Sequence, residues 1–344
     1  MSEGGRPGVD GLDLPLLERF FAQHVPGFRG GLTAELLHGG RSNLTYRATD
    51  GENSWVIRRP PLGGLTPSAH DMAREYRVMA ALADSAVPVP RAVALADDAV
   101  LGVPFSVVEY VPGSVIRTGE ELHRLPDDRI QGCAYALVDT LARLHAVDPA
   151  AVGLANFGRP EGYLARQVAR WCDQWQRVRT RELADIDTLY ARLAEACPPE
   201  SGTAIVHGDF RIDNAILAPD DPEDVRAVVD WEMATLGDPL ADLGLHLAYA
   251  EPAFAPVLGG NAASTSERLP QPGELARRYA ATSGRDLRGL GFHVALGYFK
   301  TAVIAEGIHA RFRRGLTRGA GFETVGRAPA PLAAAGLSAL AGSA

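Results

Sequence analysis

The chain has 344 residues, of which 46% are hydrophobic, so it can bury the core of one large domain or of two lobes. Lys and Arg total 34 against 42 Asp and Glu, and the net charge of −8 argues against nucleic acid and an anionic membrane as partners. No basic-then-apolar leader or run of about 18 apolar residues occurs, and Cys133, Cys172 and Cys197 lack metal-site spacing, which together predict a cytoplasmic protein with reduced thiols.

The N-terminal third has the texture of strands with two helices. Residues 1–12 are polar and rich in glycine, which predicts disorder. The expected elements are a helix over 14–24, two strands within 36–48, a third strand over 53–58, a helix over 71–84, an extended segment at 87–90 and a strand over 104–111. Pro112-Gly113 ends this texture, so we expect an N-lobe over 1–111 and a mainly helical lobe over 112–344.

Two glycines, Gly39 and Gly40, stand between the first two expected strands. Glycine lets backbone N–H groups approach phosphate closely, and Ser42 or Asn43 could add a polar donor, so this turn is a candidate phosphate loop. The pattern GxGxxG is absent, and an ordinary hairpin turn explains the glycines equally well.

A carboxylate interrupts the apolar stripe of the helix over 71–84. The stripe is expected to contain Met72, Tyr76, Met79 and Ala83. Glu75 lies on the same face, and a buried carboxylate needs a cation. Arg58, at the end of the third strand, is one candidate partner, while local pairing with Arg74 or Arg77 at the edge of the stripe is the other.

A helical stretch in the second lobe carries Tyr163, Trp171 and Trp175 among several arginines. The arginines are Arg166, Arg170, Arg177 and Arg179. This stretch could form the floor of a pocket for an anionic acceptor, but an amphipathic helix with a solvated face is the simpler interpretation.

The most informative stretch is 204–232. A short apolar run ends at His207-Gly208-Asp209, and two apolar segments then flank a turn at 219–222. An antiparallel hairpin about that turn would bring Asp230 beside Asn214, with Asp209 just ahead of both. Two carboxylates and one amide oxygen are ligands that suit Mg²⁺ with bound phosphate. Further on, Asp238 precedes Pro239 as a helix N-cap would, and Asp242 falls in the first turn of that helix.

The run His207-Gly208-Asp209-Phe210-Arg211-Ile212-Asp213-Asn214, followed by Asp230-Trp231-Glu232, resembles the catalytic core of protein-kinase-like enzymes. His-Gly-Asp and Asp-Trp-Glu are similar to the aminoglycoside phosphotransferase family of small-molecule kinases. The segments 230–243 and 297–311 resemble the branch that includes kinase domains fused to acyl-CoA dehydrogenases. The resemblance spans roughly residues 15–315 and implies an α+β, two-lobe protein-kinase-like fold, with an antiparallel sheet plus helix in the N-lobe and a mainly helical C-lobe.

The resemblance also implies roles for residues of the C-lobe. Asp209 matches the catalytic base, and Arg211 matches the catalytic-loop lysine that stabilises the transferring phosphoryl group. Asn214 and Asp230 match the Mg²⁺ ligands. His207 matches a residue that braces the loop, which we favour over a role as general base.

In the N-lobe the resemblance points to the nucleotide. Arg58 stands where kinases carry the strand lysine that contacts the phosphates, although Arg59 remains an alternative. Glu75 matches the carboxylate that pairs with that cation. The backbone from Glu109 to Val111 matches the hinge that hydrogen-bonds the adenine edge.

Together these matches predict ATP- and Mg²⁺-dependent transfer of the γ-phosphoryl group to a hydroxyl of a small molecule, with a hydroxy acid or hydroxyacyl-CoA ranked above a cationic antibiotic as the acceptor. No segment of protein-kinase length ending in Ala-Pro-Glu follows Asp230, which favours a small-molecule acceptor over a protein. An aminoglycoside-type antibiotic kinase and a non-catalytic nucleotide-binding scaffold are the alternatives.

Overall fold

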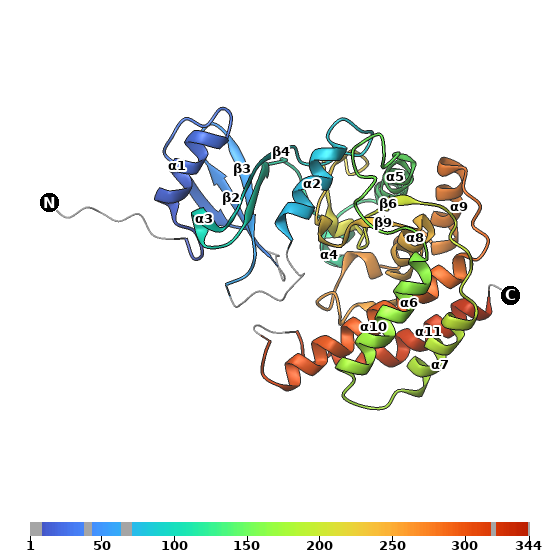
Figure 1. The fold of residues 1–344 in the computed structure, drawn as a ribbon. Helices are drawn as coiled ribbons and strands as arrows, with labels where there is room; N and C mark the ends of the chain where they lie inside the picture. The colour runs from blue at the N-terminus through green and yellow to red at the C-terminus, as the bar shows by residue number, and fades with distance from the viewer. Residues whose placement is uncertain (1–8, 38–42, 63–70, 318–320, 343–344) are drawn as a thin grey trace. The chain divides into compact units, whose positions relative to one another are not determined.

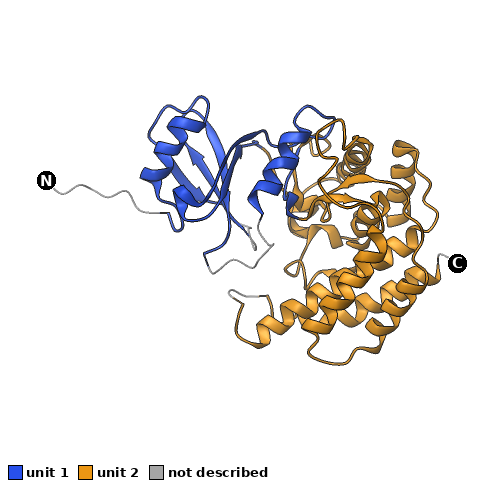
Figure 2. Ribbon diagram, in the orientation of Figure 1, with its two compact units in different colours: residues 1–112, 227–232 blue, residues 113–226, 233–344 orange. Residues whose placement is uncertain are grey.

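The computed structural model describes residues 9–37, 43–62, 71–317 and 321–342 (Figure 1). The chain divides into two compact units, 1–112 with 227–232 and 113–226 with 233–344 (Figure 2). The division lies one residue beyond the expected lobe boundary. It differs from the expectation at 227–232, because the end of the 204–232 hairpin region belongs to the first unit.

The first unit is built on a five-stranded antiparallel sheet with the order β1-β2-β3-β5-β4. Its elements are α1 (Leu14–His24), β1 (Thr33–Leu36), β2 (Leu44–Thr49), β3 (Ser54–Arg59), α2 (Met72–Leu82), β4 (Ala92–Ala96), α3 (Asp98–Leu101) and β5 (Phe105–Glu109). In the central strand β3, burial alternates from residue to residue, so Trp55 and Ile57 enter the core while Arg58 lies on the other side.

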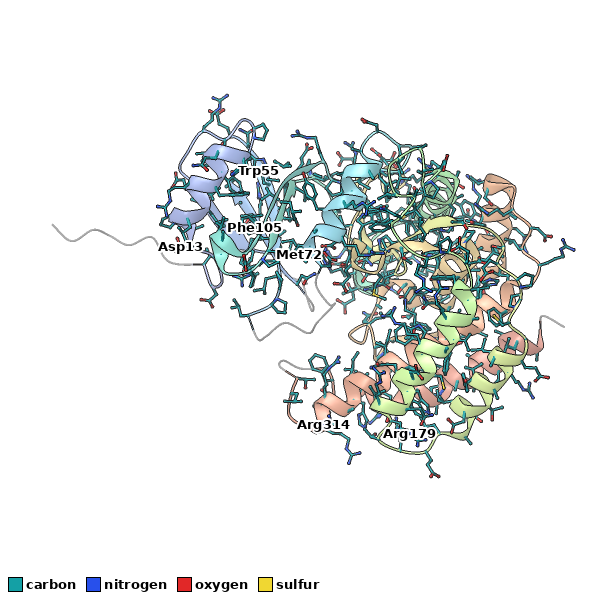
Figure 3. All side chains as sticks on the ribbon, viewed as in Figure 1. Asp13, Trp55, Met72, Phe105, Arg179 and Arg314 are labelled. Carbon is teal, nitrogen blue, oxygen red and sulfur yellow. The ribbon has the colours of Figure 1, made fainter. Side chains whose placement is uncertain are left out.

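Aromatic side chains fill the space between this sheet and α1. Trp55 and Phe105 stand on the sheet (Figure 3), and Phe21 of α1 meets Trp55 edge-to-face with ring centroids 5.4 Å apart. Helix α1 begins where Asp13 caps it, since its carboxylate accepts a hydrogen bond from the Leu16 N–H at 3.0 Å. The core therefore holds α1 and the sheet as one layered unit.

Two expectations for this unit are wrong. Residues 9–12 are ordered rather than disordered: Leu12 is buried in the core, and the Tyr46 hydroxyl donates to the Asp10 carbonyl at 2.6 Å. Residues 1–8 lie outside the described part. The extended segment at 87–90 would supply the fourth strand in the order that an N-lobe requires, but Pro88 and Pro90 have no N–H to give to a ladder, and the fourth strand is β4 (Ala92–Ala96).

The second unit is mainly helical. Its helices are α4 (Gly119–His123), α5 (Asp127–Ala146), α6 (Tyr163–Val178), α7 (Ala184–Glu195), α8 (Pro239–Ala248), α9 (Pro272–Ser283), α10 (Leu290–Arg313) and α11 (Pro329–Ala341). Its short strands are β6 (Ala204–Val206), β7 (Ala215–Leu217) and β9 (Thr235–Gly237), while β8 (Val225–Val228) begins in this unit and ends in the first. Short 3₁₀ turns occur at Ile212–Asn214, Pro252–Phe254, Ala263–Thr265 and Val325–Arg327, and a further one at Trp231–Met233 begins in the first unit and ends in the second.

Helix α10 is the central element of the second unit's core. It packs against α6, α8 and α11 (Figure 1), and its residues are buried around much of the helix, as Phe299, Ala302 and Val303 show. Among the helices of the described ranges, none combines the length and apolar character needed to cross a bilayer.

The segment between the 3₁₀ turn at Trp231–Met233 and α8 is a short strand. Strand β9 comes before α8 and pairs antiparallel with β6, with Val206 opposite Thr235 and Ala204 opposite Gly237. Because α8 begins two residues after β9, this pairing brings the first turn of α8 to the residues that follow β6. That placement builds the site.

Candidate active site

The loop after β6 makes a sharp turn at Gly208. Gly208 has φ = 81°, and a Cβ atom there would lie 2.8 Å from the Met233 carbonyl oxygen. Only glycine combines a left-handed backbone with so close an approach. The His-Gly-Asp sequence is therefore a backbone requirement of the turn that presents Asp209.

Asp242 of α8 holds this turn through its backbone N–H groups. Its carboxylate accepts hydrogen bonds from His207 N at 2.6 Å and Gly208 N at 2.8 Å, and it lies 3.3 Å from His145 Nε2. Burial alone would raise the pKa of Asp242, but its hydrogen bonds and electrostatic interactions with His145 and His207 outweigh burial and lower it. Asp242 thus remains a carboxylate able to accept from both loop amides.

Asp238 has the N-cap role expected for it. Its side chain accepts from Leu240 N at 2.8 Å, and Pro239 occupies the first helical position. It also accepts from the Ser201 N–H and hydroxyl, each at 2.6 Å. The cap therefore ties the segment before β6 to α8.

Asp209 is surrounded by donors. Tyr249 donates its hydroxyl hydrogen to Oδ1, Arg211 Nε lies 3.3 Å from Oδ1, and Asn214 Nδ2 donates to the Asp209 carbonyl at 2.8 Å. Burial would raise the pKa of Asp209, but the charge of Arg211 and the Tyr249 hydrogen bond lower it. The result is an ionised carboxylate held in one orientation.

Arg211 is locked between carboxylates. It pairs with Asp213 as well as Asp209, and its guanidinium carbon lies 5.7 Å from the Tyr249 ring centroid. Burial would lower the pKa of Arg211, but the two carboxylates raise it, so its charge is permanent. Asp213 is therefore a brace for Arg211.

His207 is fully buried, and its Nδ1 accepts a hydrogen bond from the Asp209 N–H at 3.2 Å. That contact fits the expectation of a bracing residue. A general base would instead need its free nitrogen directed at a substrate proton.

Our sequence reasoning missed two functional contacts of the loop. Tyr249 at the end of α8 bonds Asp209, and Lys300 of α10 donates from Nζ to the Gly208 carbonyl at 2.7 Å. The spacing of Asp242, His246 and Tyr249 was a usable signal for Tyr249, because steps of four and three put all three on one helical face. His246 also faces the loop, with Nδ1 3.0 Å from the Phe210 carbonyl oxygen.

In the first unit, the guanidinium of Arg58 lies close to three carboxylates. Arg58 Nη1 lies 2.9 Å from Glu75 Oε1, and Nη2 lies 2.6 Å from Asp230 Oδ1 and 3.9 Å from Glu232 Oε2. Burial raises the pKa of Glu75 to about 7, with Arg58 acting in the opposite direction. Glu75 therefore pairs with Arg58, one of its two predicted partners.

The stripe around Glu75 differs from the expected one. Tyr76 is half-buried and Ala83 is exposed. The buried residues of α2 are Met72, Glu75, Val78, Met79 and Leu82.

Arg59 lies on the other face of β3. It is buried and donates to the carbonyl oxygens of Gly11 and Pro60. Its role is to fasten the N-terminal segment to the sheet, which leaves Arg58 as the arginine associated with Glu75 and Asp230.

The other residues predicted to bind nucleotide make fewer contacts than Arg58 and Glu75. Asn43 donates to Glu232 Oε2 at 3.3 Å, Glu109 is exposed and pairs with Arg91, and Val111 follows the end of β5. Gly39, Gly40 and Ser42 lie outside the described residues.

Asp230 has a distinctive backbone. Its φ of 67° makes it the one non-glycine residue with positive φ in the described ranges. It belongs to the first unit with Arg58, while Asn214 and Asp209 belong to the second. The proposed pair of Mg²⁺ ligands therefore takes one residue from each unit and remains a prediction.

Two hollows border the catalytic loop within the second unit. One is lined by Arg211, Tyr249, Ser264 and a largely apolar set that includes Leu247, Leu269 and Leu275. The other is lined by Tyr163, Gln167, Trp171, Gly208, Asp242 and Lys300, with apolar residues of α8 and α10.

Helix α6 contributes to the second hollow in part. Tyr163 and Trp171 line it, whereas Trp175 is buried in the core and donates to Asp187 Oδ1 at 3.1 Å. None of the four arginines considered for an acceptor pocket is among its lining residues in the described chain, which agrees with the simpler interpretation of an amphipathic helix.

The sheet unit, the helical unit and the His-Gly-Asp loop define a protein-kinase-like fold. The model of the phosphotransferase enzyme family matches residues 33–281, and the chain belongs to that family. Acyl-CoA dehydrogenase family member 11 of Gallus gallus is 35% identical over 333 residues, covering 93% of this chain and 42% of that protein. The chain spans less than half the length of the first curated relatives it matches.

Solved structures share the fold. A candidate aminoglycoside phosphotransferase from Ralstonia eutropha has a TM-score of 0.81 and 32% identity, covering 96% of this chain and 98% of that one. A thermostable mutant of an aminoglycoside phosphotransferase, in ternary complex with AMP-PNP and hygromycin B, has a TM-score of 0.61 and 16% identity. That alignment covers 95% of this chain and 99% of the other.

Proposed function

We propose that this protein transfers the γ-phosphoryl group of ATP to a hydroxyl of a small molecule, with Mg²⁺ as the metal. The observation that carries the proposal is Asp209, an ionised carboxylate held by Tyr249, Arg211 and the Asn214 amide. A structurally related phosphotransferase binds AMP-PNP, which supports ATP as the donor.

Asp209 accepts the proton of the attacking hydroxyl as the oxygen–phosphorus bond forms, and the bond from the γ-phosphorus to the β,γ-bridging oxygen breaks, releasing ADP. Arg211 contributes permanent positive charge beside Asp209, where charge spreads over the transferring oxygens. Such catalysis consists mostly of positioning and charge stabilisation, and the rigid contacts of this loop suit that task.

Asn214 and Asp230 are the residues that would hold Mg²⁺ by the chemistry of their side chains. Asn214 uses its amide nitrogen on Asp209, which leaves the amide oxygen for a metal, and Asp230 supplies a carboxylate. Oxygen ligands of this kind are those that Mg²⁺ prefers. When bound, the ion would neutralise phosphate charge.

We further propose that the acceptor is a hydroxy acid or a hydroxyacyl-CoA. The hollow beside Arg211 and Tyr249 has a mostly apolar lining, and no carboxylate is among the described residues that line it. A polycationic aminoglycoside calls for acidic side chains, whereas an acyl chain is served by Leu247, Leu269 and Leu275. The likeness to an acyl-CoA dehydrogenase family member supports the same class.

The test is ADP release with MgATP and a panel of hydroxy acids, hydroxyacyl-CoA thioesters and hygromycin B, with the product checked by mass spectrometry for one added phosphoryl group. We expect turnover with a hydroxyacyl compound and a loss of about 10²- to 10⁴-fold in kcat for Asp209→Asn. Turnover of hygromycin B alone would refute the proposed acceptor. Full activity of Asp209→Asn would refute the mechanism, and nucleotide binding without ADP release from any compound would indicate a scaffold.

A further inference from the structure

Lys300 is the only lysine among the 34 cationic Lys and Arg residues of this chain. It lies on α10 beside the catalytic loop, and its Nζ donates to the Gly208 carbonyl oxygen at 2.7 Å. The remaining 33 of these residues are arginines, so position 300 alone among them carries an ammonium group in place of a guanidinium.

The Gly208 carbonyl belongs to the peptide plane that leads directly into Asp209. The other end of that plane, the Asp209 N–H, donates to His207 Nδ1 at 3.2 Å. Lys300 and His207 thus hold the two opposite polar groups of one peptide bond. Rotation of this plane would move Asp209, so the two contacts together fix the position of the carboxylate.

The tether is needed because of the residue that precedes Asp209. Glycine can adopt more backbone conformations than any other residue type. At position 208 the close approach to Met233 excludes any side chain that would limit those conformations. Asp242 fixes the Gly208 N–H, at 2.8 Å, but leaves the following peptide plane free to rotate. Lys300, acting with His207 at the other end of the plane, restricts that rotation.

The surroundings favour an ammonium over a guanidinium. The nitrogen lies 5.9 Å from the Trp171 ring centroid and lines the same hollow as Tyr163 and Gln167. Burial lowers the pKa of Lys300, while Asp209 acts in the opposite direction. A compact point charge fits here, whereas the planar fork of arginine is larger and has a fixed geometry.

We propose that Lys300 is a positioning residue that fixes the Gly208–Asp209 peptide and thereby places the carboxylate for phosphoryl transfer. This inference rests on the proposed function. Lys300 acts through the loop, and we assign it no contact with the substrate.

The test compares Lys300→Met and Lys300→Arg with Arg170→Met. Arg170 is the matched control, because its guanidinium carbon lies 5.7 Å from the same Trp171 ring but it is exposed. We expect kcat to fall about 10²-fold in Lys300→Met, since small displacements of a reacting group have effects of that size. We expect Lys300→Arg to recover only part of the loss, the KM for ATP to stay within about twofold, and Arg170→Met to keep wild-type kcat.

Hydrogen exchange of the 207–210 backbone provides a second readout that does not need turnover. It should accelerate in Lys300→Met, with a melting temperature close to wild type, and stay unchanged in Arg170→Met. Wild-type kcat or unchanged exchange in a folded Lys300 variant would overturn the inference. If Lys300→Met does not fold, Lys300→Arg decides by the same two measurements. A wild-type protein without kinase activity would refute the proposed function, while exchange would still decide whether Lys300 fixes the loop.

Discussion

Arg58 and Arg59 are adjacent on β3, and because side chains alternate along a strand they lie on opposite faces of the sheet and make different contacts. Arg58 contacts Glu75 and Asp230, whereas Arg59 donates to backbone carbonyls that include that of Gly11. Sequence alone favoured Arg58 for the phosphates but left Arg59 open. The ion pair with Glu75 supports the first choice.

We predict that Arg58→Met raises the KM for ATP about tenfold or more, because it removes the cation proposed to contact the phosphates. The accompanying loss of stability should be moderated, since a pKa of about 7 lets Glu75 become neutral once its partner is gone. Arg59→Met should keep the KM for ATP and lose about 1–3 kcal/mol of unfolding free energy in urea. The reverse pattern would assign the phosphates to Arg59.

At the scale of elements, α8 is the scaffold of the site. Its cap Asp238 holds Ser201, Asp242 holds the His207 and Gly208 amides, and Tyr249 at its end bonds Asp209. One helix with its two end residues thus holds the catalytic loop and the segment before β6. Variants on this face should affect both stability and catalysis.

Asp242→Asn should destabilise the protein by about 2–4 kcal/mol in urea unfolding. An amide nitrogen would replace one carboxylate oxygen opposite a backbone N–H, and buried donors left without acceptors are expensive. Asp286→Asn is the control, because Asp286 is an exposed carboxylate and its replacement should leave the urea midpoint close to that of the wild type. Equal effects of the two variants would contradict the anchoring role of Asp242.

His246 on the same face predicts a dependence of stability on pH. Burial lowers its pKa below the ordinary value of 6.5, and a hydrogen bond to the Phe210 carbonyl opposes this only in part. As the pH falls through about 6.5, the unfolded chain binds a proton that the folded chain does not, so stability decreases. His246→Gln should therefore lose less stability than wild type between pH 7.5 and 5.5, by about 1 kcal/mol in parallel urea titrations. Parallel curves would show that the imidazole does not contribute.

The elements that the sequence predicted well are those whose signals are local. The helix over 14–24 has the bounds of α1, and the Asp238 cap is present. β4 was misplaced because its residues Ala92–Ala96 are mostly alanine, and pairing with β5 rather than strand propensity makes them a strand. The three-residue β9 exists through its partner β6 and has no periodic pattern to detect.

For the site, the sequence supplied the loop residues but not their supports. The His-Gly-Asp motif and the spacing to Asn214 pointed to the loop, while Lys300 comes from α10, 92 residues away in the chain from Gly208. Such contacts depend on how helices pack, which short-range patterns do not encode.

At the scale of the whole molecule, the two units each hold part of the proposed chemistry. Arg58, Glu75 and Asp230 belong to the first unit, and Asp209 and Asn214 to the second. If Asp230 binds the metal and Asp209 only receives the proton, nucleotide binding and turnover should be separable by mutation. The positive φ of Asp230 guides the choice of variant, because asparagine tolerates that conformation and changes only the charge.

We therefore predict that MgATP raises the melting temperature of the wild type and of Asp209→Asn. A ligand present at 100 times its Kd adds about 2.7 kcal/mol to stability. Asp230→Asn should show a much smaller shift, as should the wild type when EDTA replaces Mg²⁺. A full shift in Asp230→Asn, or one that survives EDTA, would remove Asp230 from the metal site. Loss of the shift in Asp209→Asn would show that this carboxylate acts in nucleotide binding and not only on the acceptor hydroxyl.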